Sequence, residues 1–199
     1  MNKLKDRTEA LFEMCYELIK LAEQMLFTCR QKDKKVSSYS REAVAFFFRR
    51  SYEMIESFLI LVQKNRLVDA ALLLRSLCDM VINLTYITVD KEEKKKRAMK
   101  YMLEGNRTQL KLINTNLKGF KEISANIEDR RERLKEDLAK MEKELKNDYG
   151  DEDWELPPIE QRAYKSGEKV YNYYNLVYRT YSDIEHHNIF FGQAYIDRG

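Results

Sequence analysis

The stretch LVDAALLLRSLCDMVINLTYIT, residues 67–88, is apolar on almost every side of the helix that it predicts. A helix of this kind is buried on most faces, so we expect it at the centre of the fold. Its polar exceptions fall on one stripe, because Arg75, Asp79 and Asn83 follow at intervals of four residues, with Tyr86 beside them. Ionised groups are costly to bury unless they are paired, so the stripe predicts partners on a neighbouring helix.

The composition around this stretch favours a helical protein. The chain of 199 residues has 35% charged and 44% hydrophobic residues, and only 6 Gly and 2 Pro to form turns. Apolar residues at helical spacing predict further helices at 3–32, 40–65, 91–114, 120–148 and 167–191. Pro157 and Pro158 predict the start of an additional short helix at 159–165. We therefore predict an all-α bundle of about five to six helices.

Two of these helices form a charged antiparallel helical hairpin, residues 91–148, within a single domain of residues 1–199. Residues 114–119 are rich in Asn and end in Gly, which predicts the turn between them. The second helix of the hairpin has apolar residues at intervals of four, three and four, typical of a short coiled-coil seam. The members of this seam are Leu134, Leu138, Met141 and Leu145. Such an arm suits an oligomer contact, and an ordinary intramolecular hairpin explains the pattern equally well.

Several classes of protein are disfavoured by the sequence. The net charge of +3 gives no general argument for nucleic-acid binding. The chain has three cysteines with no metal-ligand spacing, which indicates reduced thiols in a cytoplasmic protein. The N-terminus lacks the apolar core of a signal peptide, and no run of about 18 apolar residues predicts a membrane span.

Near the C-terminus, the helix 167–191 carries the residues that look most functional. Arg179 and His186 are seven residues apart, so they return to nearly the same helix face. Ser182 lies four residues before His186 and shares that face. Asp183 lies four residues after Arg179 and four before His187, so it can pair with either.

The sequence gives little support for a metal site, a cofactor site or a nucleotide-binding loop. Neither GxxxxGK[ST] nor GxGxxG occurs. The spacing of Asp183 and His186 is half of a di-metal helix motif, whose second half needs a histidine on another helix. His186 and His187 point about 100° apart, which disfavours joint ligation. Ser182 and His186 lack the strand-turn-helix elbow of a serine hydrolase. We therefore expect no metal and no cofactor.

The pair Arg179 and His186, late in an all-helical chain, resembles the R-x(4–6)-H motif of the HEPN superfamily (higher eukaryotes and prokaryotes nucleotide-binding domains). The resemblance implies a metal-independent endoribonuclease in which His186 transfers a proton and Arg179 stabilises the phosphorane charge. It also implies a homodimer, RNA as the substrate, and a toxin or phage-defence effector with a regulatory protein partner. Arg49, Arg50 and the basic run 94–97 are candidates for guiding RNA.

A second resemblance covers more of the chain. The sequence Arg75-Ser76-Leu77-Cys78-Asp79, followed much later by Tyr178, Ser182 and His186, resembles a bacterial helical family of unknown function with RSLxE-like and YxxxSxxxH helices. Asp79 stands where Glu is usual. Chains of that family continue beyond the histidine, so we expect a further C-terminal segment beyond Gly199.

Three functions stay open at this point. The first is the ribonuclease, with the stripe of Arg75 facing the stripe of Arg179, Ser182 and His186 across one cleft. The second is a non-catalytic interaction or sensor module, in which Arg75, Asp79 and His186 form a structural polar core. The third is an enzyme for a small phosphorylated ligand. Catalysis requires an accessible Arg179 and His186, whereas a structural role predicts that both are buried and hydrogen-bonded.

Overall fold

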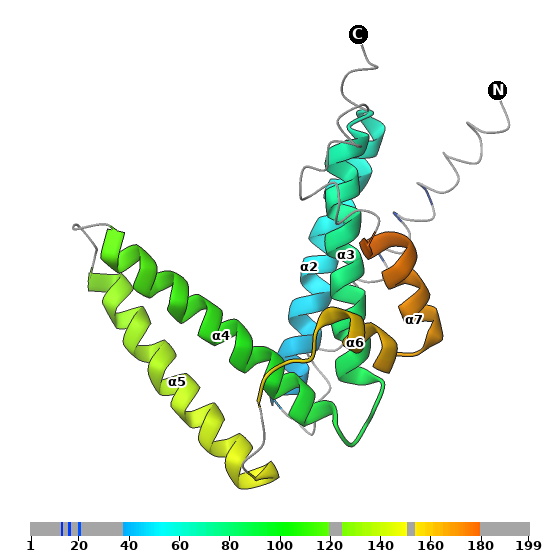
Figure 1. Cartoon of the computed structure of the whole chain (residues 1–199). Coiled ribbons are helices and arrows are strands. Elements are labelled where there is room, and N and C mark those ends of the chain that lie inside the picture. The colour runs from blue at the N-terminus through cyan, green and yellow to red at the C-terminus, as the bar shows by residue number, and fades with distance from the viewer. Residues whose placement is uncertain are drawn as a thin grey trace, which may run out of the picture. The chain divides into compact units, whose positions relative to one another are not determined.

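The computed structural model describes residues 38–119, 125–150 and 154–179, together with Glu13, Tyr16 and Lys20. Throughout these ranges the chain is helical apart from short connections, which confirms the predicted all-α class (Figure 1). The helices are α2 (Ser38–Gln63), α3 (Leu67–Thr88), α4 (Lys94–Gly119), α5 (Ala125–Tyr149), α6 (Ile159–Lys165) and α7 (Glu168–Tyr173), followed by the π-helical turn η1 (Tyr174–Tyr178). Glu13, Tyr16 and Lys20 are exposed and helical, while the rest of the predicted helix 3–32 lies outside the described residues.

The predicted turn at 114–119 is wrong, because α4 continues to Gly119. Asn and Thr disfavour a helix by less than about 1 kcal/mol each, so contacts with a neighbouring helix can override them. Those contacts reach far along α4, since Arg130 of α5 donates to the side chain of Gln109 (3.4 Å). The hydroxyl of Thr115 bonds back to the carbonyl of Lys111 (2.9 Å), as it does within a helix.

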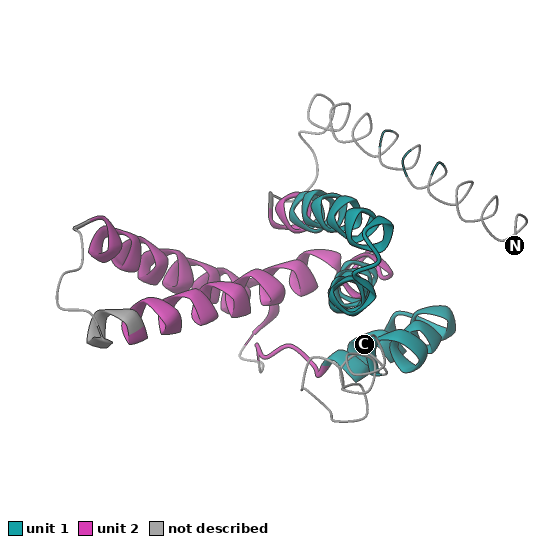
Figure 2. Ribbon diagram, turned by 90° about the horizontal axis from the view of Figure 1, so that it is seen from above, with its two compact units in different colours: residues 1–36, 44–85, 159–199 teal, residues 37–43, 86–158 magenta. Residues whose placement is uncertain are grey.

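Compact packing divides the chain into two units, coloured separately in Figure 2. Unit 1 comprises residues 1–36, 44–85 and 159–199, and unit 2 comprises residues 37–43 and 86–158. The start of α2 and the end of α3 therefore belong to unit 2. Each unit has a core of its own, formed by different helices.

Unit 2 is built on the antiparallel pair α4 and α5 (Figure 1). The predicted seam of α5 is confirmed, because all four of its members, Leu134, Leu138, Met141 and Leu145, are buried. Leu138, Met141 and Leu145 pack with Met99 and Leu103 of α4, both of which are completely buried. A periodic apolar seam therefore holds the charged hairpin together.

Charged and phenolic groups at one end of the hairpin form a small cluster. Nζ of Lys95 lies 3.1 Å from Glu144 and 2.7 Å from Asp148, and these carboxylates raise the pKa of Lys95. The hydroxyl of Tyr39 donates to Oε2 of Glu144 (2.8 Å). Burial and this carboxylate raise the pKa of Tyr39 to about 12. The cluster ties the beginning of α2 to the end of α5.

Unit 1 contains the antiparallel helices α2 and α3, connected by a tight turn at Asn65. Asn65 has a positive φ of 55°, which asparagine tolerates better than most residues. The side chains of Ser51 and Met80 meet between the two helices (3.4 Å). On its other side α3 packs against α6, α7 and η1, where Cys78, Ile82, Ala163 and Tyr174 form a buried core.

We predict that Leu145→Ala lowers the free energy of unfolding by about 2–5 kcal/mol, because it leaves a cavity in the seam of unit 2. Leu112→Ala is the matched control, since Leu112 lies on α4 and is 59% exposed. Its effect should stay within about 0.5 kcal/mol. Urea denaturation followed by circular dichroism measures both. Equal losses in the two variants would contradict the buried seam.

We also predict a stability loss at alkaline pH that depends on Tyr39. Its pKa is about 12 in the folded chain against 10.0 for an unperturbed tyrosine, so the folded state holds this proton more tightly. The stabilisation is complete below pH 10 and disappears as the pH rises towards 12. Tyr39→Phe should therefore lose less stability than the wild-type chain between pH 10 and 12. The free energy of unfolding of both proteins is measured by urea denaturation at several pH values. An equal loss in the two proteins between pH 10 and 12 would refute the prediction.

Candidate functional site

The polar stripe of α3 faces other helices of unit 1. Nη2 of Arg75 donates to the hydroxyl of Tyr178 (3.0 Å), and the guanidinium carbon lies 4.6 Å from the centre of the same ring. One contact is a hydrogen bond and the other is a cation–π interaction. The expected connection between the central helix and the last helix is therefore present at Arg75 and Tyr178.

Further along the polar stripe of α3, Asn83 contacts a residue of α6. The amide of Asn83, which is only 3% exposed, donates to Oδ1 of Asp79 (3.0 Å) and accepts a hydrogen bond from Nη1 of Arg162. Arg162 was not among the residues predicted from sequence. Its only sequence signal is a basic residue four positions before Ser166, within a helix of seven residues, which is too short to show a periodic pattern.

The last helix departs from the unbroken α-helix that the sequence predicts for residues 167–191. It is α-helical over α7 and π-helical over η1, and the backbone N–H of Arg179 bonds to the carbonyl of Tyr174, five residues back. The thiol of Cys78 lies against this segment, 3.7 Å from the carbonyl oxygen of Tyr173. The thiol therefore lies beside the carbonyl of the residue that directly precedes the π-helical turn.

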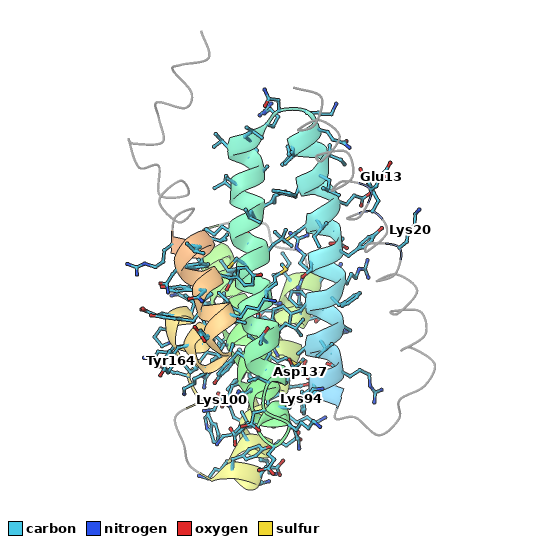
Figure 3. All side chains as sticks on the ribbon, turned by 90° about the vertical axis from the view of Figure 1, so that its right-hand side faces the viewer. Glu13, Lys20, Lys94, Lys100, Asp137 and Tyr164 are labelled. Atoms are coloured by element: carbon cyan, nitrogen blue, oxygen red, sulfur yellow. The ribbon has the colours of Figure 1, made fainter. Side chains whose placement is uncertain are left out.

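The tyrosines of the last helices pack mainly on one another. Tyr171 and Tyr174 are stacked with ring centres 6.1 Å apart, and Tyr174 and Tyr178 are stacked at 5.3 Å. Burial raises the pKa of Tyr174, while the positive charge of Arg179 acts in the opposite direction. Tyr174 is therefore part of the buried core of unit 1, and the rings of Tyr171 and Tyr178 pack against it. Tyr164, in contrast, is 72% exposed and projects outward from α6 (Figure 3).

Arg179 is exposed at the end of the described segment, immediately after η1. The other residues predicted on its helix, Ser182, Asp183, His186 and His187, lie outside the described residues. The cleft proposed between the two stripes therefore stays a prediction. Within the described ranges the structure brings together Arg75 and Tyr178, and separately Asp79, Asn83 and Arg162.

The proposed RNA-guiding residues have contacts within the chain. Arg49 and Arg50 are exposed and both reach Glu53, at 3.2 and 3.3 Å. In the basic run, Nη1 of Arg97 donates to the carbonyl of Tyr86 (2.7 Å), and Lys95 pairs with carboxylates of α5. These contacts favour a structural role for the run.

Unit 2 contains a hollow of about 300 Å³. It lies between the start of α2 and the hairpin, with Met102 and Met141 among its lining residues and Glu42, Asp137 and Lys140 as its charged groups. No residue predicted as functional lines it. Over the described ranges, no group of three or more potential metal ligands occurs. The same ranges hold no helix long and apolar enough to span a membrane.

We predict that Asn83→Ala lowers the free energy of unfolding by about 2–3 kcal/mol, because it removes a buried acceptor from the Arg162 guanidinium. Asn172→Ala is the control, since Asn172 is exposed on α7 and should change stability by less than about 0.5 kcal/mol. Urea denaturation of both variants provides the measurement. An equally small effect at Asn83 would show that this polar contact contributes no stability.

Comparisons with known proteins place the chain in a family without assigning it an activity. No curated protein and no solved structure matches it. The model of a family of unknown function, DUF5677, matches residues 41–198, a range that includes the α3 stripe, α6 and η1. This agrees with the resemblance to a helical family of unknown function. The chain belongs to the family of unknown function DUF5677.

Proposed function

We propose that this chain is a metal-independent endoribonuclease of the HEPN type, with Arg179 and His186 as its catalytic pair. The observation that carries the proposal is the exposure of Arg179 directly after a π-helical turn. The structural polar core considered above requires Arg179 to be buried and hydrogen-bonded, which its exposure does not fit. π-Helical turns are frequent at functional sites, because they place side chains where a regular helix does not.

The proposed chemistry is transfer of a phosphodiester within RNA. The ribose 2′-oxygen attacks phosphorus, and the bond from phosphorus to the 5′-oxygen breaks, which gives a 2′,3′-cyclic phosphate and a 5′-hydroxyl. The imidazole of His186 takes the proton from the 2′-hydroxyl or gives one to the leaving 5′-oxygen. The guanidinium of Arg179 stabilises the negative charge on the phosphorane oxygens by paired hydrogen bonds.

The supporting residues of this proposal lie on two helices. Ser182, Asp183 and His187 are assigned from their spacing to Arg179 and His186. Arg75 and Asp79 of α3 and Tyr178 of η1 are the other supporting residues, and Arg75 donates to the hydroxyl of Tyr178. The homodimer, the toxin or defence role and the regulatory protein partner belong to the same proposal, because they come from the resemblance to the HEPN superfamily. The proposed cytoplasmic location comes from the three cysteines, which have no metal-ligand spacing.

A non-catalytic interaction module is the second candidate, and one observation favours it. Arg75, Asp79, Asn83 and Arg162 are partly or fully buried and have hydrogen-bond partners among their neighbours, as in a structural polar core. The two candidates differ at the catalytic pair. In the module, Arg179→Ala and His186→Ala should affect stability and leave RNA intact. In the ribonuclease, they should affect RNA and leave the fold intact.

We predict that the purified chain cleaves RNA in the presence of EDTA and that Arg179→Ala or His186→Ala lowers the rate at least about 100-fold. Arg133→Ala is the matched control, because Arg133 is an exposed arginine on α5 in the other unit. The assay uses end-labelled RNA on a denaturing gel, with the product ends identified as cyclic phosphate and 5′-hydroxyl. Circular dichroism checks that every variant is folded.

The same variants are then induced in a bacterial host, with growth and total RNA as measurements. Growth arrest with discrete RNA fragments in the wild type and Arg133→Ala, but in neither catalytic variant, supports the ribonuclease. Intact RNA in both assays with the wild-type chain rejects it. Loss of folding in Arg179→Ala and His186→Ala, with intact RNA throughout, supports the interaction module.

A further inference from the structure

The turn η1 changes the direction in which Arg179 leaves the helix. Hydrogen bonds in a π-helical turn join residues five apart instead of four, so the turn holds one additional residue. Each residue of an α-helix advances by about 100° and 1.5 Å. Arg179 therefore lies about 100° away, around the helix axis, from the position that an unbroken α-helix would give it.

Helix α3 contacts this turn at both of its ends. The Cys78 thiol meets the carbonyl of Tyr173, the residue just before η1 (3.7 Å). The Arg75 guanidinium meets the ring and hydroxyl of Tyr178, the last residue of η1. Cys78 and Arg75 are three residues apart, so they share one face of α3. A single helix face therefore contacts the turn where it begins and where it ends.

The properties of Cys78 suit this contact. Its side chain is 8% exposed and packs in the core beside Tyr174. Burial raises the pKa of the thiol, although the backbone N–H of Tyr178 opposes this, so the sulfur keeps its proton as a donor at neutral pH. A thiol is a weak donor with a long bond length, which lets it occupy the space beside the turn without drawing the backbone closer.

We propose that Cys78 and Arg75 are positioning residues for Arg179, because they stabilise the π-helical turn that sets the direction of its side chain. The inference deepens the proposed function and rests on it for its catalytic consequence. Its structural half, that α3 stabilises η1 through these two side chains, is independent of any activity.

The test compares four variants of the full chain. Cys78→Val keeps a side chain of similar volume but removes the donor, and Cys78→Ser keeps a donor. Tyr178→Phe keeps the stacked ring and removes the hydroxyl that Arg75 binds. Ser76→Ala is the control, because Ser76 lies on the same helix and its hydroxyl donates to the carbonyl of Leu72 within that helix (3.1 Å). The measurements are backbone and arginine side-chain NMR signals, and kcat and KM for RNA cleavage.

We predict that Cys78→Val and Tyr178→Phe shift the backbone signals of residues 174–179 towards α-helical values and move the side-chain signal of Arg179. Misplacing a catalytic group by about 1 Å can cost on the order of 100-fold in rate. We therefore expect kcat to fall by roughly 10- to 100-fold, with KM within about twofold. Cys78→Ser should lose less than Cys78→Val, and Ser76→Ala should match the wild type.

Unchanged signals at residues 174–179 in both Cys78→Val and Tyr178→Phe would overturn the inference, even if the wild-type chain is an active ribonuclease. Shifted signals with unchanged kcat would overturn the positioning role. If the wild-type chain cleaves no RNA, the proposed function fails and the positioning role fails with it. In that case the NMR comparison still decides whether Cys78 and Arg75 stabilise the turn. If Cys78→Val does not fold, Tyr178→Phe alone decides the role of Arg75, and unchanged signals at residues 174–179 in it would then overturn the inference.

Discussion

The cost of placing charged and amide groups on a largely apolar helix governs the arrangement of unit 1. Arg75, Asp79 and Asn83 lose most of their contact with water on α3, so each needs a partner from the protein. Tyr178 and Arg162 supply such partners, from η1 and α6 respectively. Directional hydrogen bonds therefore add to the buried core of Cys78, Ile82, Ala163 and Tyr174 in orienting these two short elements.

Unit 2 is stabilised in a different way. Its charged residues are abundant but largely exposed, and pairs such as Arg107 with Glu142 (2.9 Å) contribute at most about 1 kcal/mol each. The buried seam of α5 and the completely buried Met99 and Leu103 of α4 supply the main stabilisation. The chain thus combines a hairpin in unit 2 that depends on periodic apolar packing with a core in unit 1 that also contains specific polar contacts. The described residues of the proposed site, Arg75, Asp79, Tyr178 and Arg179, belong to unit 1.

This difference explains which features could be predicted from the sequence. The bounds of α3 and α6 and the seam at Leu145 follow from apolar spacing and from the prolines before Ile159, which are local properties. The end of α4 was missed because helix contacts outweigh the weak preference of Asn for turns. Arg162 and the π-helical turn were missed for another reason. Both depend on side chains of α3, which are distant in sequence and leave no periodic signal.

The π-helical turn also limits what residue spacing can establish about the candidate site. Spacing rules assume about 3.6 residues per turn, so they apply to α7 but not across η1. The spacing of Arg179 and His186 begins after the turn, so η1 does not enter it. The relation of Arg179 to Tyr171 or Tyr174 does not follow from spacing. Cys78 and Arg75 contact the two ends of η1 and so connect α3 to the turn that precedes Arg179. The α3 side of the candidate site therefore meets the last helix through contacts between helices, which residue spacing alone does not reveal.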